Sequence, residues 1–379
     1  MSKFEKKNKL IKGKWGDNME EKRTILIESW SPICHAQAFV EETNSCIYFY
    51  IWFNPDSEES SVKSCWICNT TDAPLELSLD EMQEGEAPRM PEYNVLHEKR
   101  GIQLNSETLE IVWFEEGDSA ALLENGKLLC VIPSWSGLNN FHGYSRYAKE
   151  EHLLAWPLQE AEEILMERVE RSKRFWASFD EEGGYWEQAQ KMHIQVLQHF
   201  FGEYKKYYAL DRGEFPPKAY ITGEKDGICY GISAGISLMC MPKVEMYYQD
   251  AERDYRRIEI GFATLKKHEP LVEIVGAFIS GISNMPWQEL TFLAHGHTIP
   301  YTNIKGYSAI WFVNTKELPQ IIAPTYPKVI GDEVNLLWAI PVTEEEYQWL
   351  LEHPIEEALQ NCSNIEWLHV FDGVKKIEW

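Results

Sequence analysis

Apolar residues occur along this chain in short runs, and the spacing of those runs changes between its first and second parts. Residues 45–53 form a continuous aromatic and β-branched run that ends before Pro55, which predicts a strand. Asn125 and Gly126 stand between two apolar runs and predict a hairpin, because both residues tolerate the positive φ angles of a tight turn. We therefore expect residues 23–135 to be rich in β-structure.

Two helical patterns separate this part of the chain from the rest. Apolar residues recur at helical spacing over residues 158–169 and again over residues 186–200, which predicts two helices. Between them stands the acidic, glycine-rich segment 180–184, whose composition is typical of a turn or linker. We place a domain boundary at this segment.

The remaining residues alternate between strand and helix patterns. The final strand pattern is apolar on both faces, as in the central strand of a sheet. A capping box follows it, because Thr343 can accept a hydrogen bond from the amide of Glu346 while the Glu346 carboxylate reaches back. The predicted elements before the box are strands at residues 219–222, 228–239, 257–263, 307–314 and 333–340, and a helix at residues 270–283.

These patterns predict a mixed fold, α+β or α/β, with two domains that each consist of a mixed β-sheet packed with helices. A length of 379 residues fits two domains, because one domain usually holds about 100–200 residues. We expect a β-rich N-terminal domain over residues 23–180, which ends in a helix, and a second domain over residues 185–379. Residues 1–22 carry seven lysines and few apolar residues, so we expect a flexible basic tail.

Charge is the strongest global signal. The chain has 36 Lys and Arg against 60 Asp and Glu, a formal net charge of -24. Such a field repels nucleic acid and anionic membranes and attracts basic partners, although acidic proteins also owe their solubility to it. The sequence lacks an apolar stretch long enough for a membrane span and an apolar signal segment at its start, so we expect a cytoplasmic protein.

Two patterns resemble parts of metal sites. Cys65 and Cys68 have the spacing of half a zinc site, with Cys34 and His35 as the nearest candidates to complete it. His295 and His297 would point to one face of an extended segment. Both patterns are incomplete, and most cysteines stand in apolar runs where a thiol behaves as a small buried hydrophobe. We expect no metal and no other cofactor.

Residues 231–235 read Gly-Ile-Ser-Ala-Gly, which resembles the nucleophile elbow of α/β hydrolases. The elbow requires a sharp turn into a helix, whereas the alternating pattern here continues through residues 236–239 as in a strand. We therefore expect the two glycines to mark a bulge or close packing, and we predict no catalytic residue.

Clustered acids offer a further candidate chemistry. Glu115, Glu116 and Asp118 follow two aromatic residues, and residues 344–346 are three consecutive glutamates. Paired carboxylates serve acid–base catalysis when their pKa values differ. The same acids fit a turn and a helix start, or a face that binds a basic partner through aromatic anchors and acidic steering.

Four stretches resemble the suppressor of fused family. The most specific reads VNLLWAIPVTEEEY, a buried strand with a proline exit and an acidic capped helix. The resemblance covers roughly residues 190–365, about half of the chain. The stretches in chain order are PKVEMY at residues 242–247, RIEIGF at 257–262, HGHTIP at 295–300 and VNLLWAIPVTEEEY at 334–347.

This resemblance implies a mixed α/β domain that binds other proteins. In animals the relatives restrain a transcription factor, and bacterial relatives look like immunity proteins that neutralise toxins. The animal protein carries the domain towards its N-terminus, whereas here an unfamiliar β-rich region precedes it. The resemblance therefore implies protein binding, in a domain order that differs from that of the animal protein.

We predict a non-catalytic protein that binds a protein partner, specifically an immunity protein whose partner is a basic toxin. The alternatives are a hydrolase or metal-dependent enzyme housed in the N-terminal domain, and a regulator that sequesters a transcription factor. The acidic loop at residues 76–91 and the aromatic segment at residues 133–147 are the candidate binding face. The candidate partner-binding residues are Glu81, Glu84, Glu86, Trp135 and Tyr144.

Overall fold

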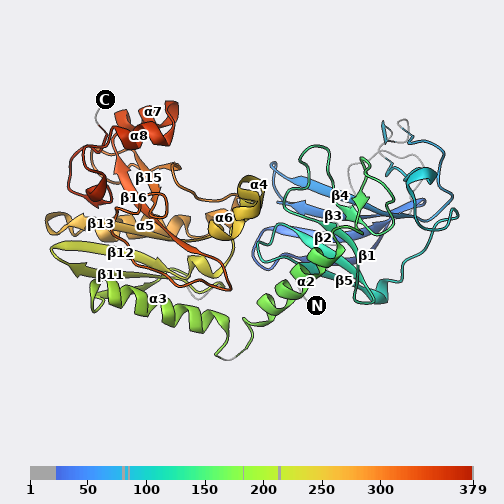
Figure 1. Ribbon diagram of the computed structural model, residues 1–379, viewed down its shortest axis with the longest axis horizontal. Helices are drawn as coiled ribbons and strands as arrows, with labels where there is room; N and C mark the ends of the chain where they lie inside the picture. The colour runs from blue at the N-terminus through green and yellow to red at the C-terminus, as the bar shows by residue number, and fades with distance from the viewer. Residues whose placement is uncertain (1–22, 79–81, 84–85, 182, 212–214, 378–379) are drawn as a thin grey trace.

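The chain forms an elongated molecule in which a β-rich half and a mixed half are joined through two helices. The computed structural model describes residues 23–78, 82–83, 86–181, 183–211 and 215–377. The β-rich half contains strands β1 to β9, and the C-terminal half is built around one large sheet (Figure 1). This arrangement confirms the predicted mixed fold.

Two sheets, whose strands are mostly antiparallel, pack against each other in the N-terminal half. Phe49 and Trp66 of one sheet share an apolar cluster with Leu122 and Ile132 of the other, so the two sheets enclose a common core. The first sheet consists of β1 (Thr24–Trp30), β2 (Ala36–Glu42), β3 (Cys46–Phe53) and β4 (Ser61–Asn69), and the second of β5 (Leu109–Trp113), β6 (Ala120–Glu124), β7 (Lys127–Ile132), β8 (Tyr144–Ser145) and β9 (Trp156–Pro157).

Two predictions for this half are confirmed locally, and one is corrected. The apolar run at residues 45–53 is strand β3, and Asn125 and Gly126 have φ angles of 50° and 75° in the turn from β6 to β7. The first predicted helix begins later than its pattern, at Glu162, because Trp156 and Pro157 pair with β8.

Helices α2 (Glu162–Ala177) and α3 (Tyr185–Phe201) follow each other and connect the two halves. The predicted linker at residues 180–184 lies between them. The largest apolar cluster is continuous across this connection, since it contains Phe49, Phe175 and Phe262. Separate apolar cores therefore do not define the two domains, and the division at residues 180–185 stays a prediction.

One mixed sheet organises the C-terminal half. Its strands run in the order β10-β11-β12-β13-β16-β15-β14, with β17 paired to β13, and β13 is parallel to β16. The strands are β10 (Lys206–Ala209), β11 (Ala219–Lys225), β12 (Ile228–Ala234), β13 (Arg257–Leu265), β14 (Thr298–Pro300), β15 (Ala309–Asn314), β16 (Val334–Val342) and β17 (Val370–Phe371).

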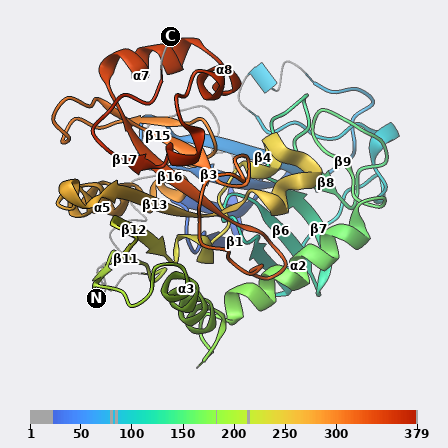
Figure 2. The same ribbon diagram turned by 60° about the vertical axis from the view of Figure 1, so that its left-hand side comes forward.

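Helices cover both faces of this sheet. Leu197 of α3 shares one apolar cluster with Trp338 of β16, and Val275 of α5 shares another cluster with Leu337 of the same strand. Figure 2 shows α3 beside β11 and β12, with α7 and α8 at the opposite end of the sheet. The helices are α4 (Val244–Tyr248), α5 (Leu271–Ile282), α6 (Met285–Gln288), α7 (Glu344–Glu352) and α8 (Ile355–Gln360).

Strand β16 is central and apolar on both faces, as its sequence predicts. Leu336 and Leu337 are 1% and 0% exposed, and the strand lies between β13 and β15. The predicted capping box is also present, because Thr343 accepts from the amide of Glu346 and the Glu346 carboxylate accepts from the amide of Thr343. These contacts confirm the final strand-to-helix motif.

Candidate functional site

The junction between the two halves contains a buried network of charged side chains. Glu115 and Glu116 lie in the turn from β5 to β6, and Arg256 lies immediately before β13. Arg256 donates to Glu116 at 2.7 Å and lies 3.2 Å from a Glu115 oxygen. All three side chains are at most 5% exposed. Of the alternatives for these acids, the turn is present, and Glu115 and Glu116 are buried against arginines instead of forming an exposed face.

Asp332 joins the network from the C-terminal half. Its carboxylate accepts from Arg253 at 2.8 Å, from Arg256 at 2.9 Å and from Arg257 at 2.8 Å. Burial alone would raise the pKa of Asp332, but Arg257 and Arg256 lower it to about 2. Charge-assisted contacts of this kind offset the cost of removing the ions from water.

Helix α2 supplies the remaining cations. Arg171 donates to Glu115 at 2.8 Å, and Arg168 contacts Glu116 at 3.2 Å and Glu245 of α4 at 2.9 Å. Burial raises the pKa of Glu116, yet Arg168 and Arg256 outweigh that effect and lower it to about 2. The network thus connects the β5–β6 turn, α2, α4 and the start of β13, and it fixes how the two halves meet.

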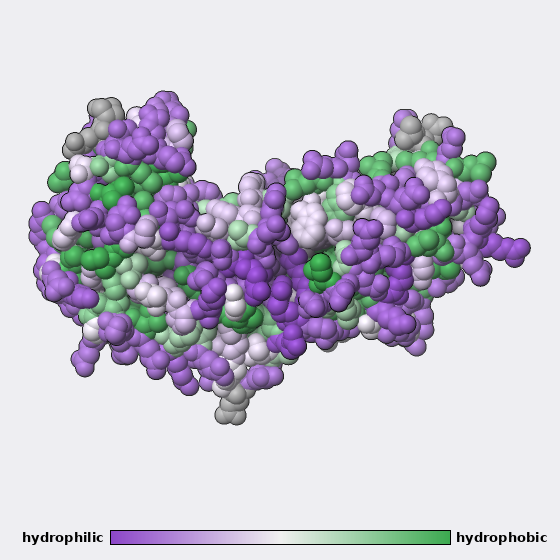
Figure 3. All heavy atoms as spheres, viewed as in Figure 1, coloured by the Kyte–Doolittle hydropathy of each residue, from purple (hydrophilic) through white to green (hydrophobic). Residues whose placement is uncertain are grey.

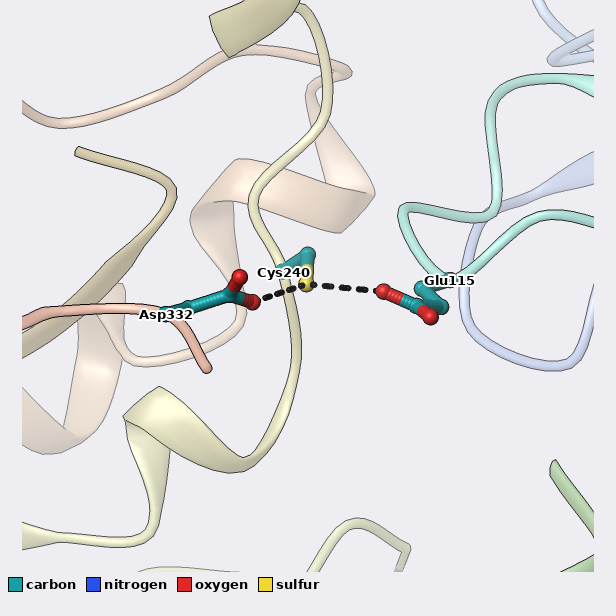
Figure 4. Close-up of side chains that lie close together, drawn as sticks. All are labelled: Glu115, Cys240 and Asp332. Carbon is teal, nitrogen blue, oxygen red and sulfur yellow. Dashed lines mark hydrogen bonds between the residues drawn. The ribbon is translucent and has the colours of Figure 1, made fainter. Parts of the chain in front are cut away.

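Cys240 lies between two of these carboxylates. Its thiol is 3.8 Å from Glu115 and 3.9 Å from Asp332 (Figure 4). The three groups are close enough to hold a metal ion. However, arginines already contact both carboxylates, and burial raises the pKa of the Cys240 thiol, whereas a metal requires the thiolate. The donor set therefore fits ion pairing better than a cation.

The two metal patterns seen in the sequence lie in different halves of the molecule. Cys65 and Cys68 are both fully buried on β4, and burial raises the pKa of Cys68. His295 accepts from the amide of Asn314, while the His297 ring packs against Phe292. Among the described residues, neither pattern takes part in a group of three potential ligands. The absence of a metal stays a prediction.

Residues 231–235 do not form a nucleophile elbow. Ser233 lies within β12 and donates to Glu259, 2.5 Å away, in the interior of the sheet. A side chain at Gly231 would overlap Tyr220, and Gly235 has a φ of 117°. Close packing therefore explains Gly231 and a tight turn explains Gly235, which also ends the strand five residues before its predicted end at residue 239.

Sequence reasoning missed a buried polar cluster beside this turn. Glu259 accepts from the hydroxyl of Ser237 at 2.6 Å and from the amide of Gly235 at 2.8 Å, while His193 of α3 lies 3.5 Å from the same carboxylate. These side chains are buried, and burial lowers the pKa of His193. The cluster holds the turn after β12 in place. Its residues are far apart along the chain, so no local sequence pattern predicts that they meet.

The candidate partner-binding residues lie on the N-terminal half. Glu81 and Glu84 fall outside the described residues, and Glu86 is exposed. Trp135 and Tyr144 are half-buried, and both rings contact Phe141. Burial raises the pKa of Tyr144, and the charges of Glu151 and Glu245 add to that effect.

The comparison with protein families matches the C-terminal half. The family model of the suppressor of fused protein (SUFU) matches residues 219–372. The C-terminal half contains a suppressor of fused domain. The predicted resemblance is thereby confirmed, with bounds that shift from roughly residues 190–365 to residues 219–372. No curated protein matches the chain.

The suppressor of fused domain contains the whole large sheet except β10. It supplies Arg256, Arg257 and Asp332 to the junction, whereas Glu115, Glu116 and the α2 arginines come from outside the domain. The charged network is therefore the place where this domain is attached to the β-rich half. In the described residues, no helix is long and apolar enough to cross a membrane.

Proposed function

We propose that this protein binds a protein partner without catalysing a reaction, and that it acts as an immunity protein which neutralises a basic toxin. The observation that carries the proposal is the suppressor of fused domain at residues 219–372, which is a protein-interaction domain. The net charge of -24 supports a basic partner, because opposite charges accelerate encounter.

The chemistry of the interior also favours binding over catalysis. Glu115, Glu116 and Asp332 are neutralised by arginines, and Ser233 and Ser237 donate to Glu259 below the surface. Catalytic groups must reach a substrate, whereas these groups contact one another. The cysteines form no disulfide among the described residues, and we propose that the protein works in the cytoplasm.

We further propose that the partner contacts the loop containing Glu86 and the aromatic pair Trp135 and Tyr144. Half-buried rings on a well-packed scaffold are typical binding anchors. Trp135→Ala is expected to raise the dissociation rate of the partner while the melting temperature changes little. A fall in melting temperature with unchanged dissociation would assign this ring to the core instead.

The direct test is binding to the product of the adjacent gene. We expect the purified full-length protein to form a stable complex with that product in calorimetry and to suppress its toxicity when both are expressed together. If the adjacent product is a metabolic enzyme or shows no binding, the immunity proposal is wrong, although the suppressor of fused domain remains.

A further inference from the structure

Five rings gather on the surface of the suppressor of fused domain around helix α4. Tyr247 contacts Phe292 with 5.1 Å between ring centroids, and Phe292 lies 5.4 Å from His297. Tyr248 stacks on Tyr255 at 4.3 Å and also meets Phe292. We call these five residues the α4 aromatic cluster.

The local backbone holds the cluster at the surface. Lys243 has a φ of 61° and turns the chain sharply after Pro242, so that α4 begins at Val244. Val244 is buried and anchors the helix, whereas Tyr247 is 67% exposed. The exposed Tyr247 ring stands beside other rings, so its face is available to a partner that would bury it.

The cluster already accommodates one cation from its own chain. The Lys316 ammonium lies 4.6 Å from the centroid of the Tyr255 ring and 3.2 Å from Asp254. Glu317 accepts a hydrogen bond from the Tyr255 hydroxyl at 2.8 Å. Rings and carboxylates thus already cooperate here to hold a positive charge, as in other cation–π sites.

Acidic residues surround the exposed rings. Asp250 and Glu289 are exposed, and Glu252 is half-exposed, on the same short segments that carry the rings. Figure 3 shows a hollow between the two halves at the position where Figure 1 places α4. A positively charged segment that enters this hollow would meet ring faces and carboxylates together.

We propose that the α4 aromatic cluster binds an arginine-rich segment of the protein partner. Arginine fits better than lysine because its planar guanidinium stacks on an aromatic ring and contacts a carboxylate at the same time. This inference rests on the proposed protein-binding function and names its docking surface, but the cationic site can be tested without the partner.

Two peptides of equal charge distinguish recognition of arginine by the aromatic rings from attraction by the net negative charge of the protein. Fluorescently labelled hexa-arginine and hexa-lysine are titrated with the full-length protein, and their affinities are compared by anisotropy. We expect hexa-arginine to bind roughly two- to five-fold more tightly, the range that one exposed cation–π contact supports. Tyr247→Ala is expected to abolish this difference, and Asp250→Lys to weaken both peptides.

Trp367 and Glu366 supply matched controls, because Trp367 is 48% exposed and its neighbour is an exposed acid. Trp367→Ala is expected to preserve the preference for arginine, and Glu366→Lys to weaken binding less than Asp250→Lys. Equal affinity for both peptides, or equal losses at the two sites, would overturn the proposal. A preference for arginine without any binding to the adjacent gene product would instead retain the site and reject the immunity role.

Discussion

Arg256 contacts three carboxylates from two distant parts of the chain. Its guanidinium lies within 3.2 Å of Glu115, Glu116 and Asp332, and it is 2% exposed. These contacts satisfy the fork of donors that a guanidinium presents. The side chain therefore stabilises the junction by neutralising charge that water cannot reach.

Replacing Arg256 by methionine is expected to destabilise the protein by about 3–5 kcal/mol, because it leaves buried carboxylates without their shared partner. Urea unfolding monitored by tryptophan fluorescence measures the change. Lys99→Met is the control, since Lys99 pairs with Glu92 at the surface, where ion pairs contribute little. Equal effects of the two substitutions would show that the buried network contributes no more than a surface pair.

The two cysteines of the Cys65–Cys68 pattern are predicted to bind no zinc. Both thiols are buried within an apolar cluster, and the raised pKa of Cys68 disfavours the thiolate that zinc requires. Elemental analysis of the purified protein is expected to find less than stoichiometric zinc. One equivalent of zinc that disappears in the Cys65→Ser, Cys68→Ser double variant would contradict this prediction.

At the scale of elements, strand β16 is the clearest case in which a sequence pattern predicts the position of a strand in the sheet. It pairs in parallel with β13 and antiparallel with β15, and apolar side chains cover both of its faces. The capping box at Thr343 then starts α7 directly after the strand. Local sequence therefore specifies this whole strand-to-helix unit.

Leu337→Ala is expected to destabilise the protein by about 2–5 kcal/mol, since Leu337 is fully buried and its loss leaves a cavity. Leu351→Ala provides the control on nearby α7, where the side chain is 57% exposed. Chemical denaturation of both variants makes the comparison. A loss below about 1 kcal/mol at Leu337 would mean that the sheet refills the cavity.

At the scale of the whole molecule, the junction predicts a loss of stability in acid. The folded-state pKa values of Glu116 and Asp332 are both about 2, below their ordinary values of 4.5 and 3.8. Their contribution is fully present above those ordinary values and is lost as pH falls towards 2. Glu245 has the opposite effect on the pH dependence of stability. Burial raises its pKa despite Arg168, so its ionisation disfavours the folded state.

Urea midpoints measured between pH 6 and pH 3 are expected to fall with pH, and to fall less steeply in the double variant Glu116→Gln, Asp332→Asn. The two proteins are compared by how steeply the urea midpoint falls with pH. The midpoints themselves differ at every pH, because the double variant lacks ion pairs. An unchanged slope would assign the acid sensitivity to other carboxylates.

The net charge of -24 makes a separate prediction about association. Exposed charges are screened over roughly 8 Å at physiological ionic strength, so the association rate with a basic partner is expected to fall as salt rises. The dissociation rate is expected to change less. Glu86→Lys is expected to slow association without unfolding the protein. Stopped-flow kinetics at two salt concentrations would contradict electrostatic steering if association were insensitive to salt.

The sequence by itself determined the elements that depend on neighbours along the chain. The turn at Asn125 and Gly126, the buried strand β16 and the capping box at Thr343 are all visible in local spacing and are present in the structure. The suppressor of fused resemblance also rested on such local motifs, and the family match confirms it.

Only the tertiary structure decided which charged and polar residues meet. An acid cluster has the same sequence whether water solvates it or arginine neutralises it, so local sequence does not reveal that Arg256 lies beside Glu115 and Glu116. Ser237 and Glu259 likewise come from different elements and meet His193 of α3 only through packing. Burial and pairing depend on the contacts of the folded chain, and local sequence carries no record of those contacts.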